Sequence, residues 1–461
     1  MSEVDKVLAR VDAGLDESLK RLFALLRIKS ISADPHYKAD CASAAQWCAR
    51  TLTEIGIAAE VRETIGHPMV VGHYREAGEH APHVLFYGHY DVQPVDPLAL
   101  WDRDPFDPAV VDVAGEKQIK ARGAEDDKGQ LMTFVEAARA WLAETGRLPV
   151  NLTVLFEGEE ESSSPSMLPF LTANAEELKA EIALVCDTGM WDRRTPAITT
   201  ALRGLVYEEV FIRAANRDLH SGSFGSAARN PIHVLVKILA DLRDESGRIA
   251  IPDFYQGVHE VSAERKAQWL SLGLDEAEFL GEVGLSVPAG EKGFSLLEQI
   301  WARPTAEVNG ISGGYTGEGA KTVIPAEASA KVSFRLVGDQ DPEAIRRSFR
   351  NFLEARLPSD CTATFISHGG DRAVSQPSDS PWVRKSMAAL SEEWGRDAVL
   401  TAMGGSIPIV TQFKHLLGMD SLLIGFGLEA DRIHSPNEKY NLSSFHGGIR
   451  SWARVLAAIA T

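Results

Sequence analysis

Apolar runs of strand length recur along the chain, and helical patterns separate them. The runs cover residues 84–88, 152–156, 182–186 and 422–426. None alternates apolar with polar positions, which is typical of parallel strands covered on both faces. Apolar positions spaced three and four apart predict helices around them, at residues 7–26, 130–143, 166–180 and 443–459. This rhythm predicts an α/β fold whose mostly parallel sheet is flanked by helices.

The middle of the chain has a different pattern. Shorter strands are predicted at residues 197–201, 205–213, 328–337 and 361–367. Two helices, at residues 230–242 and 341–356, carry proline at the first turn, where its missing N–H is tolerated. This combination is typical of a small α+β domain. Within it, residues 253–297 are polar and helical and carry no motif that indicates a function.

The parallel pattern resumes near residue 380, with a helix at 382–394 and a strand that ends at Phe426. We therefore expect both ends of the chain to form one domain, from residues 1–200 and 377–461. Residues 201–376 would form a second domain inserted into the first. The sequence contains no internal repeats.

Side chains that bind metal ions follow each apolar run. In chain order they are His89 with Asp91, Glu157 to Glu161, Asp187, and Asp431 with His434. Residues two apart in a strand face the same way, so Asp91 would orient the His89 imidazole. His-x-Asp alone is equally typical of a polar loop after a buried strand. Because open α/β sheets build their sites at the carboxyl ends of strands, the recurrence predicts a metal centre there.

Asp126 and Asp127 stand just before the helix at residues 130–143. Adjacent carboxylates at a helix start are most simply explained as caps that complement the helix dipole. Beside two other ligand-bearing loops, a carboxylate that bridges two metal ions is the better interpretation.

Charge and composition narrow the function further. The 461 residues include 65 acidic and 47 basic side chains, a formal net charge of -18. Phosphate binding needs clustered Lys and Arg, so no nucleic-acid partner is expected. No apolar run approaches the roughly 20 residues that span a bilayer, so no membrane partner is expected either. Residues 1–30 predict an amphipathic helix and not a signal peptide.

The four cysteines, Cys41, Cys48, Cys186 and Cys361, show no metal-binding spacing. Cys41 and Cys48 fall on the apolar stripe of a predicted helix, which favours core packing. A reduced, cytoplasmic setting is therefore expected.

Five motifs resemble those of the dinuclear metallopeptidases, which include carnosinases, cytosolic non-specific dipeptidases, aminoacylases and acetylornithine deacetylases. They are Gly88-His-Tyr-Asp-Val-Gln-Pro94, Arg122-Gly-Ala-Glu-Asp-Asp-Lys-Gly129, Glu160-Glu-Ser162, Asp218-Leu-His-Ser-Gly222 and His434-Ser-Pro-Asn-Glu-Lys439. The likeness extends from about Ser30 to the final helix. Two further motifs are similar to the dipeptidase branch in particular, Gly319-Ala-Lys-Thr-Val-Ile-Pro325 and Gly404-Gly-Ser-Ile-Pro408.

The resemblance implies a catalytic domain that binds two divalent metal ions per subunit. His89 and Asp187 would bind one ion, Glu161 and His434 the other, and Asp126 would bridge them. Such imidazole and carboxylate ligands suit Zn²⁺. Mn²⁺ and Co²⁺ remain alternatives, because there is no thiolate ligand that would favour zinc over them. Family members hold the bond after the bridging aspartate in cis, so a cis Asp126–Asp127 peptide is expected.

The resemblance also assigns the proton transfers. Glu160 would be the general base on the metal-bridging water, and Asp91 the partner of His89. The acidic run from Glu157 allows a register error of one residue. The pair of glutamates directly before Ser162, as in the family, sets the register.

Substrate-binding roles are implied in the same way. Arg335 would bind the C-terminal carboxylate of the substrate, and His220 would stabilise the oxyanion. Thr322, His368 and Ser406 would be further substrate contacts. In the dipeptidase branch, the counterparts of His220 and Thr322 serve the neighbouring subunit's site. The inserted domain is therefore expected to act as a lid and to form a homodimer.

The expected activity is hydrolysis of unblocked dipeptides, which are small-molecule substrates. An N-acyl amino acid amidohydrolase shares the metals, base and carboxylate clamp and is the alternative. A non-catalytic metal-binding dimer would not need Glu160. A two-metal phosphoesterase would need basic residues near the site, which the sequence lacks.

Overall fold

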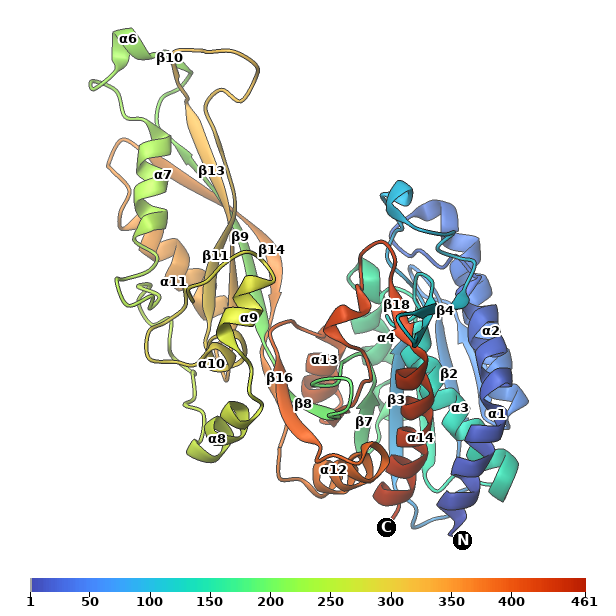
Figure 1. The fold of residues 1–461 in the computed structure, drawn as a ribbon. Coiled ribbons are helices and arrows are strands. Elements are labelled where there is room, and N and C mark those ends of the chain that lie inside the picture. Colours follow the sequence, from blue (N-terminus) through green and yellow to red (C-terminus); the bar gives the residue numbers. More distant parts are fainter. Residues whose placement is uncertain (1) are drawn as a thin grey trace. The chain divides into compact units, whose positions relative to one another are not determined.

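The chain folds into two compact units in the computed structural model, which describes residues 2–461 (Figure 1). Unit 1 comprises the chain up to Thr200, Gln376–Thr401 and Gln412–Thr461. Unit 2 comprises Ala201–Ser375 and Ala402–Thr411. The short return of residues 402–411 to unit 2 has no counterpart in the sequence pattern.

The larger sheet has the strand order β1-β2-β6-β3-β7-β17-β8-β15, and β16 pairs with β8. Its strands are β1 (Ala58–Arg62), β2 (Met69–Tyr74), β3 (His83–His89), β6 (Asn151–Glu157), β7 (Ile182–Val185), β8 (Ala197–Leu202), β15 (Val374–Ser375), β16 (Val399–Met403) and β17 (Asp420–Leu423). The central strands β6, β3, β7 and β17 are parallel. The pairs toward both edges are antiparallel. The predicted α/β class with a parallel centre is confirmed.

Helices cover both faces of this sheet, which is why its central strands lack polar alternation. One layer consists of α1 (Glu3–Leu26), α2 (Lys38–Glu54), α3 (Lys128–Thr145), α12 (Pro381–Trp394) and α14 (Leu442–Ile459). On that side Phe86 stacks on Phe134 of α3, with ring centroids 3.7 Å apart. The next residue, Tyr87, faces the opposite side and meets Phe413 at 5.9 Å. The helices α1, α3 and α14 lie side by side (Figure 1).

Three short helices belong to the second side, α4 (Met167–Ala173), α5 (Ala175–Leu178) and α13 (Pro408–Leu416). The sequence predicts one helix over residues 166–180, but the chain breaks at Asn174, whose side chain bonds the Phe170 carbonyl at 2.8 Å. The strand predicted to end at Phe426 ends at Leu423. A Cβ at Gly425 would lie 1.8 Å from the Thr188 carbonyl oxygen. The backbones of these two residues therefore lie too close together for any side chain at position 425.

Unit 1 also contains a small sheet, β18-β5-β4, and several short 3₁₀ turns. Its strands are β4 (Ala109–Val113), β5 (Glu116–Lys120) and β18 (Lys439–Asn441). The turns are η1 (Pro35–Tyr37), η2 (Leu98–Leu100), η3 (Glu160–Ser162) and η4 (Glu429–Asp431). Two of them, η3 and η4, lead into the loops that carry candidate ligands.

Unit 2 is built on an antiparallel sheet with the order β11-β13-β9-β14. These strands are β9 (Gly204–Arg213), β11 (Thr305–Gly313), β13 (Glu327–Leu336) and β14 (Thr362–Asp371). Its covered face packs on α7 (Pro231–Ala240) and α11 (Pro342–Glu354) through a separate apolar core. Alternate residues of β9 lie on the opposite face and are partly exposed. The sequence did not predict β11, because most of its side chains are exposed and show no apolar alternation.

The remaining elements of unit 2 are short. They are β10 (Leu219–His220), β12 (Val323–Ile324), α6 (Ser221–Phe224), α8 (Ala263–Ser271), α9 (Glu276–Gly281) and α10 (Leu296–Trp301). The strands β10 and β12 form a two-stranded ribbon. Asn230 and Asp341 accept backbone hydrogen bonds at the starts of α7 and α11, the two helices predicted with proline in the first turn.

Candidate metal centre

Four parallel neighbours of the larger sheet deliver the candidate ligands to one edge. His89 is the last residue of β3, and Asp187 lies two residues beyond β7. Glu161 lies in η3 after β6, and His434 follows η4 after β17. Because β6, β3, β7 and β17 are adjacent and parallel, the loops after them converge. Asp126 reaches the same place from the loop before α3.

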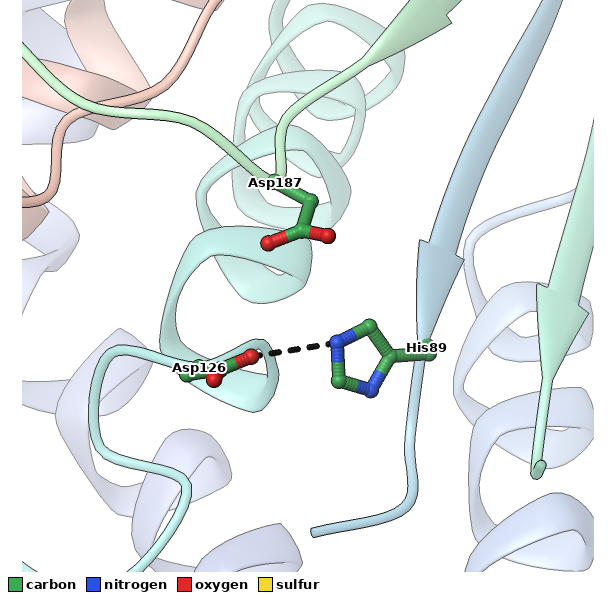
Figure 2. Close-up of side chains that lie close together, drawn as sticks. All are labelled: His89, Asp126 and Asp187. Carbon is green, nitrogen blue, oxygen red and sulfur yellow. Dashed lines mark hydrogen bonds and ion pairs between the residues drawn. The ribbon is translucent and has the colours of Figure 1, made fainter. Parts of the chain in front are cut away.

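Two groups of ligand atoms result, and Asp126 belongs to both. His89, Asp126 and Asp187 form the first group, and their ligand atoms lie within 4.8 Å of one another. Figure 2 shows these three side chains pointing toward a common centre. Asp126, Glu161 and His434 form the second group by the same distance criterion. One oxygen of Asp126 lies 3.1 Å from His89 Nε2, and the other lies 2.9 Å from His434 Nε2.

The charged side chains of the two ligand groups shift one another's pKa values. Burial raises the pKa of Asp126, but hydrogen bonds with His434 and His89 outweigh it, so the pKa lies below its ordinary value. Hydrogen bonds to Asp126 and Glu161 raise the pKa of His434 to about 10. Burial and the charge of Asp126 raise the pKa of Asp187 to about 7. The cluster therefore stabilises added positive charge.

The donor set fits a pair of divalent cations. It combines the imidazoles of His89 and His434 with three carboxylates, and both donor types bind zinc, manganese and cobalt. The carboxylates outnumber the imidazoles, so cations would neutralise a net negative site. No cysteine belongs to either group, although Cys186 directly precedes Asp187 in the sequence.

Asp91 supports both groups from behind. Its backbone carbonyl oxygen lies 3.2 Å from His89 Nδ1 and its Oδ1 lies 3.3 Å from the same nitrogen, and its side chain is fully buried. Its other oxygen accepts a hydrogen bond from the Glu161 backbone N–H at 3.0 Å. Asp91 thus orients one ligand through the ring and another through the backbone, leaving His89 Nε2 free to face the cluster.

The acidic run after β6 places its glutamates in separate environments. Glu157 accepts a hydrogen bond from the Tyr87 hydroxyl at 2.7 Å. Glu159 accepts backbone hydrogen bonds from His67 at 2.6 Å and Ser166 at 3.0 Å. Burial, with the charges of Asp187 and Glu161 acting in the same direction and that of His89 opposing them, raises the pKa of Glu160 to about 9. Only Glu161 belongs to a ligand group.

The comparisons with known proteins agree with this geometry. The model for "Peptidase family M20/M25/M40" matches residues 85–458, most of the chain. The chain belongs to this family. The family resemblance expected from the sequence is therefore confirmed, and the protein is a hydrolase. Membership implies a divalent metal cofactor, which the donor set described above fits.

Three relatives illustrate the similarity. The Cys-Gly metallodipeptidase DUG1 of Saccharomyces cerevisiae is 32% identical over 380 residues, which cover 81% of this chain and 78% of the relative. The Beta-Ala-His dipeptidase of Homo sapiens is 29% identical over 383 residues, covering 82% and 75%. The solved structure of the M20 family metallo-carboxypeptidase Sso-CP2 from Sulfolobus solfataricus aligns with a TM-score of 0.84 at 30% identity, covering 96% and 99%.

The loop that carries Asp126 in this peptidase is held by a residue that the sequence analysis did not single out. The carboxylate of Glu438, fully buried, accepts hydrogen bonds from the backbone N–H groups of Gly123 and Glu125 at 3.0 Å and of Asp126 at 3.2 Å. Arg122 donates to the same carboxylate at 2.7 Å. Glu438 lies four residues after His434, so it ties two ligand loops together. Its only sequence signal is its place in the quoted His434 motif.

Two further expectations concern neighbours of the ligands. The peptide bond between Asp126 and Asp127 is cis, as the resemblance predicted. Asp127 is not a member of either ligand group, and its Oδ2 accepts a hydrogen bond from the His89 backbone N–H at 3.0 Å. Asp431, which the sequence pattern placed beside His434 as a possible donor, forms a buried ion pair with Lys439 and lies outside both groups.

The residues expected to bind substrate all lie in unit 2 of the peptidase. His220 lies on β10 opposite Val323 of β12, and Thr322 directly precedes β12, where its carbonyl accepts a hydrogen bond from the Ser221 N–H at 3.1 Å. Arg335 lies on β13 opposite Leu205 of β9. His368 Nε2, on β14, lies 3.1 Å from Glu209 Oε2. Ser406 lies in the 402–411 stretch.

No helix in residues 2–461 is both long enough and apolar enough to cross a membrane.

Proposed function

We propose that this protein is a metal-dependent dipeptidase that hydrolyses the peptide bond of unblocked dipeptides. The observation that carries the proposal is that Asp126 belongs to two ligand groups, while Glu160 directly precedes the Glu161 ligand. The names of two relatives, a Cys-Gly metallodipeptidase and a Beta-Ala-His dipeptidase, support dipeptides as substrates.

The proposal assigns one ion to each ligand group. His89, Asp126 and Asp187 hold the first, and Asp126, Glu161 and His434 hold the second. Zinc is the first choice and manganese or cobalt the alternative, because the donors accept all three. When bound there, such ions would supply Lewis-acid chemistry, which makes a water molecule more acidic and polarises the scissile carbonyl.

Glu160 is assigned the proton transfers. Its carboxylate accepts a proton from the attacking water and delivers it to the nitrogen of the leaving amine. A partly buried carboxylate beside His89 and Asp187 is suited to this, because its proton affinity is raised by its surroundings. Asp91 keeps His89 Nδ1 engaged, so that Nε2 stays a ligand.

Substrate binding is assigned to unit 2. Arg335 binds the C-terminal carboxylate, and His368 and Ser406 contact the rest of the substrate. His220 Nδ1 accepts a hydrogen bond from the Gly222 N–H at 3.0 Å, so its neutral ring carries the proton on Nε2. That N–H is free to donate to the oxyanion that develops on the scissile carbonyl. Thr322, next to His220, acts with it.

The proposal includes a homodimer formed through unit 2, in which His220 and Thr322 act in the partner subunit's site. Strand β11 is the edge of its sheet, and Val308 and Ile311 on it are 41% and 55% exposed. An edge strand with exposed apolar side chains is suited to pairing with a second copy. A mass measurement by light scattering tests this, and a monomer with full activity contradicts it.

A cytoplasmic location completes the proposal. All four cysteines are free and buried, which is usual for proteins kept in reducing surroundings. Fractionation of the source cells checks this, with activity expected in the fraction that contains no membranes.

The deciding experiment is a substrate panel on metal-loaded protein. It contains Cys-Gly, β-Ala-His and Ala-Gly together with N-acetylglycine and N-acetylalanine. Hydrolysis of free dipeptides is expected. Activity on the N-acetyl compounds alone would instead identify an amidohydrolase.

The variant Glu160→Gln tests the mechanism separately. It should lower kcat by about 10²–10⁴-fold, the usual contribution of a general base, and leave metal content unchanged. A wild-type kcat in this variant would remove Glu160 from the mechanism.

A further inference from the structure

One arginine of unit 2 holds a loop and leaves part of its guanidinium without a partner. Arg203 directly precedes β9, and its Nε donates to the Gly404 carbonyl at 2.9 Å. Its backbone N–H donates to the Gly405 carbonyl at 3.1 Å. A Cβ on Gly404 would lie 2.8 Å from Arg203 Nη2, so the guanidinium packs closely against this glycine. Arg203 thereby fixes the loop that carries Ser406.

The other terminal nitrogen of Arg203 faces no acceptor. Nη1 is buried and has no hydrogen-bond partner among residues 2–461. Burial, with the positive charge of Arg335 acting in the same direction, lowers the pKa of Arg203 to about 10. Arg335 is opposite Leu205, two residues beyond Arg203, so both side chains start from neighbouring positions. The two guanidinium groups are therefore close enough to repel each other.

No carboxylate of the described chain balances this charge. Neither Arg203 nor Arg335 forms an ion pair within residues 2–461, and the carboxylate of Glu307, the nearest acidic influence on Arg203, is bound by Arg243. Two like charges that share a partly buried site without a counterion are unfavourable. A bound anion removes both the repulsion and the unpaired donor. Guanidinium groups bind carboxylates in a bidentate manner.

We propose that Arg203 is a specificity-determining residue that forms, with Arg335, a two-arginine site for the free α-carboxylate at the C-terminal end of the substrate. The inference rests on the proposed function, in which Arg335 binds that carboxylate. Arg203 adds the second guanidinium and fixes the Gly404–Ser406 loop beside it. A substrate whose carboxylate is blocked as an amide loses both interactions.

The test compares Arg203→Met and Arg203→Lys with wild type on Ala-Gly and on its amide, Ala-glycinamide. Arg203→Met should raise KM for Ala-Gly at least tenfold with a smaller change in kcat, and leave KM for the amide unchanged. Arg203→Lys should recover part of the loss, because it keeps the charge without the bidentate fork. Arg248→Met is the matched control, since this arginine of unit 2 stacks on Tyr255 at 3.7 Å instead.

Equal losses on Ala-Gly and its amide, or a loss confined to kcat, would overturn the carboxylate site and leave Arg203 only its role in the loop. A calorimetric titration with glycine and glycinamide separates this result from failure of the proposed function. If wild type cleaves no dipeptide but binds glycine more tightly than glycinamide, and Arg203→Met abolishes the difference, the two-arginine site stands. If wild type shows no preference for glycine, the site is refuted.

Discussion

The two main sheets of this protein use their surfaces in different ways. The larger sheet is covered by helices on both faces, so its central strands are mostly apolar and carry the candidate ligands beyond their ends. The sheet of unit 2 is covered on one face by α7 and α11, and its other face presents partly exposed side chains such as Arg335. A sheet buried on both sides concentrates chemistry at its rim, whereas a half-open sheet spreads it over a face.

The two units also differ in how they balance the charge of a buried carboxylate. Glu208 on β9 is fully buried, and its two oxygens each lie 2.8 Å from an arginine nitrogen, one of Arg346 and one of Arg350. Asp126 is also buried, but its oxygens meet only His89 and His434. Fixed charges of the chain balance the first carboxylate. The second belongs to a cluster with excess negative charge, which is why cations are expected there and not in unit 2.

The largest expected effect follows from removing the shared ligand. Asp126→Ala should abolish binding of both ions and lower activity by roughly 10⁴-fold or more, as loss of a central catalytic group does in other hydrolases. Metal analysis after dialysis is the direct measurement. Asp187→Ala, which removes a ligand of one group only, should keep one ion. Two ions retained by Asp126→Ala would show that the groups do not share this residue.

In unit 2, removing the carboxylate of Glu208, whose charge is balanced by arginines, should lower stability and leave metal binding unchanged. Glu208→Ala removes the buried carboxylate that Arg346 and Arg350 share, although Arg346 keeps its ion pair with Glu343. Loss of one partner from a buried ion pair costs up to about 3–5 kcal/mol in unfolding free energy. Urea unfolding measures it, with hydrogen exchange of β9 as a local readout. The control Glu327→Gln removes an exposed ion pair with Arg213 on the same sheet and should cost less than about 1 kcal/mol. Equal costs would refute the distinction.

A smaller effect is expected from the residue that joins two ligand loops. Glu438→Gln replaces one oxygen acceptor by an amide donor, so part of the backbone of the Asp126 loop loses its partner. Outer contacts of this kind are worth about 10–100-fold in metal affinity. Competition with a chromogenic chelator measures the affinity. Glu136→Gln is matched, because Glu136 is a buried carboxylate of unit 1 bound to Arg21 at 2.6 Å, away from the ligands. Unchanged affinity in Glu438→Gln would contradict the positioning role.

The smallest expected effect is a pH dependence of the unfolding free energy, caused by His83 of strand β3 in the larger sheet. Burial and the charge of Arg75 lower the pKa of His83 from 6.5 to about 4. The folded state therefore binds fewer protons than the unfolded state between these values, and stability should fall as pH drops from 6.5 toward 4. His83→Gln retains a group that can bond Thr153, at 2.9 Å from the ring in the wild type, and should flatten this part of the profile. Thermal unfolding across the pH range provides the data, and an unchanged slope would exclude His83.

Much of unit 1 could be predicted from sequence because its signals are local. Four apolar runs mark its central strands, and spaced apolar positions mark its long helices. Each candidate ligand stood in the loop after such a run or before a helix. Prediction failed where long-range contacts decide the outcome. Asn174 breaks a helix, Gly425 ends a strand against Thr188, and β11 forms because β13 offers an edge.

Sequence by itself determined which residue types could bind metal ions and on which loops they lie, because hydrophobic periodicity fixes where strands and helices end. Only the tertiary structure decided that β6, β3, β7 and β17 are neighbours, so that residues as far apart as His89 and His434 share Asp126. It also placed Glu161, the ligand that the family motif had indicated, in a ligand group and revealed Glu438 and Arg203. Strand order and the burial of single side chains depend on contacts between distant segments, which no local pattern encodes.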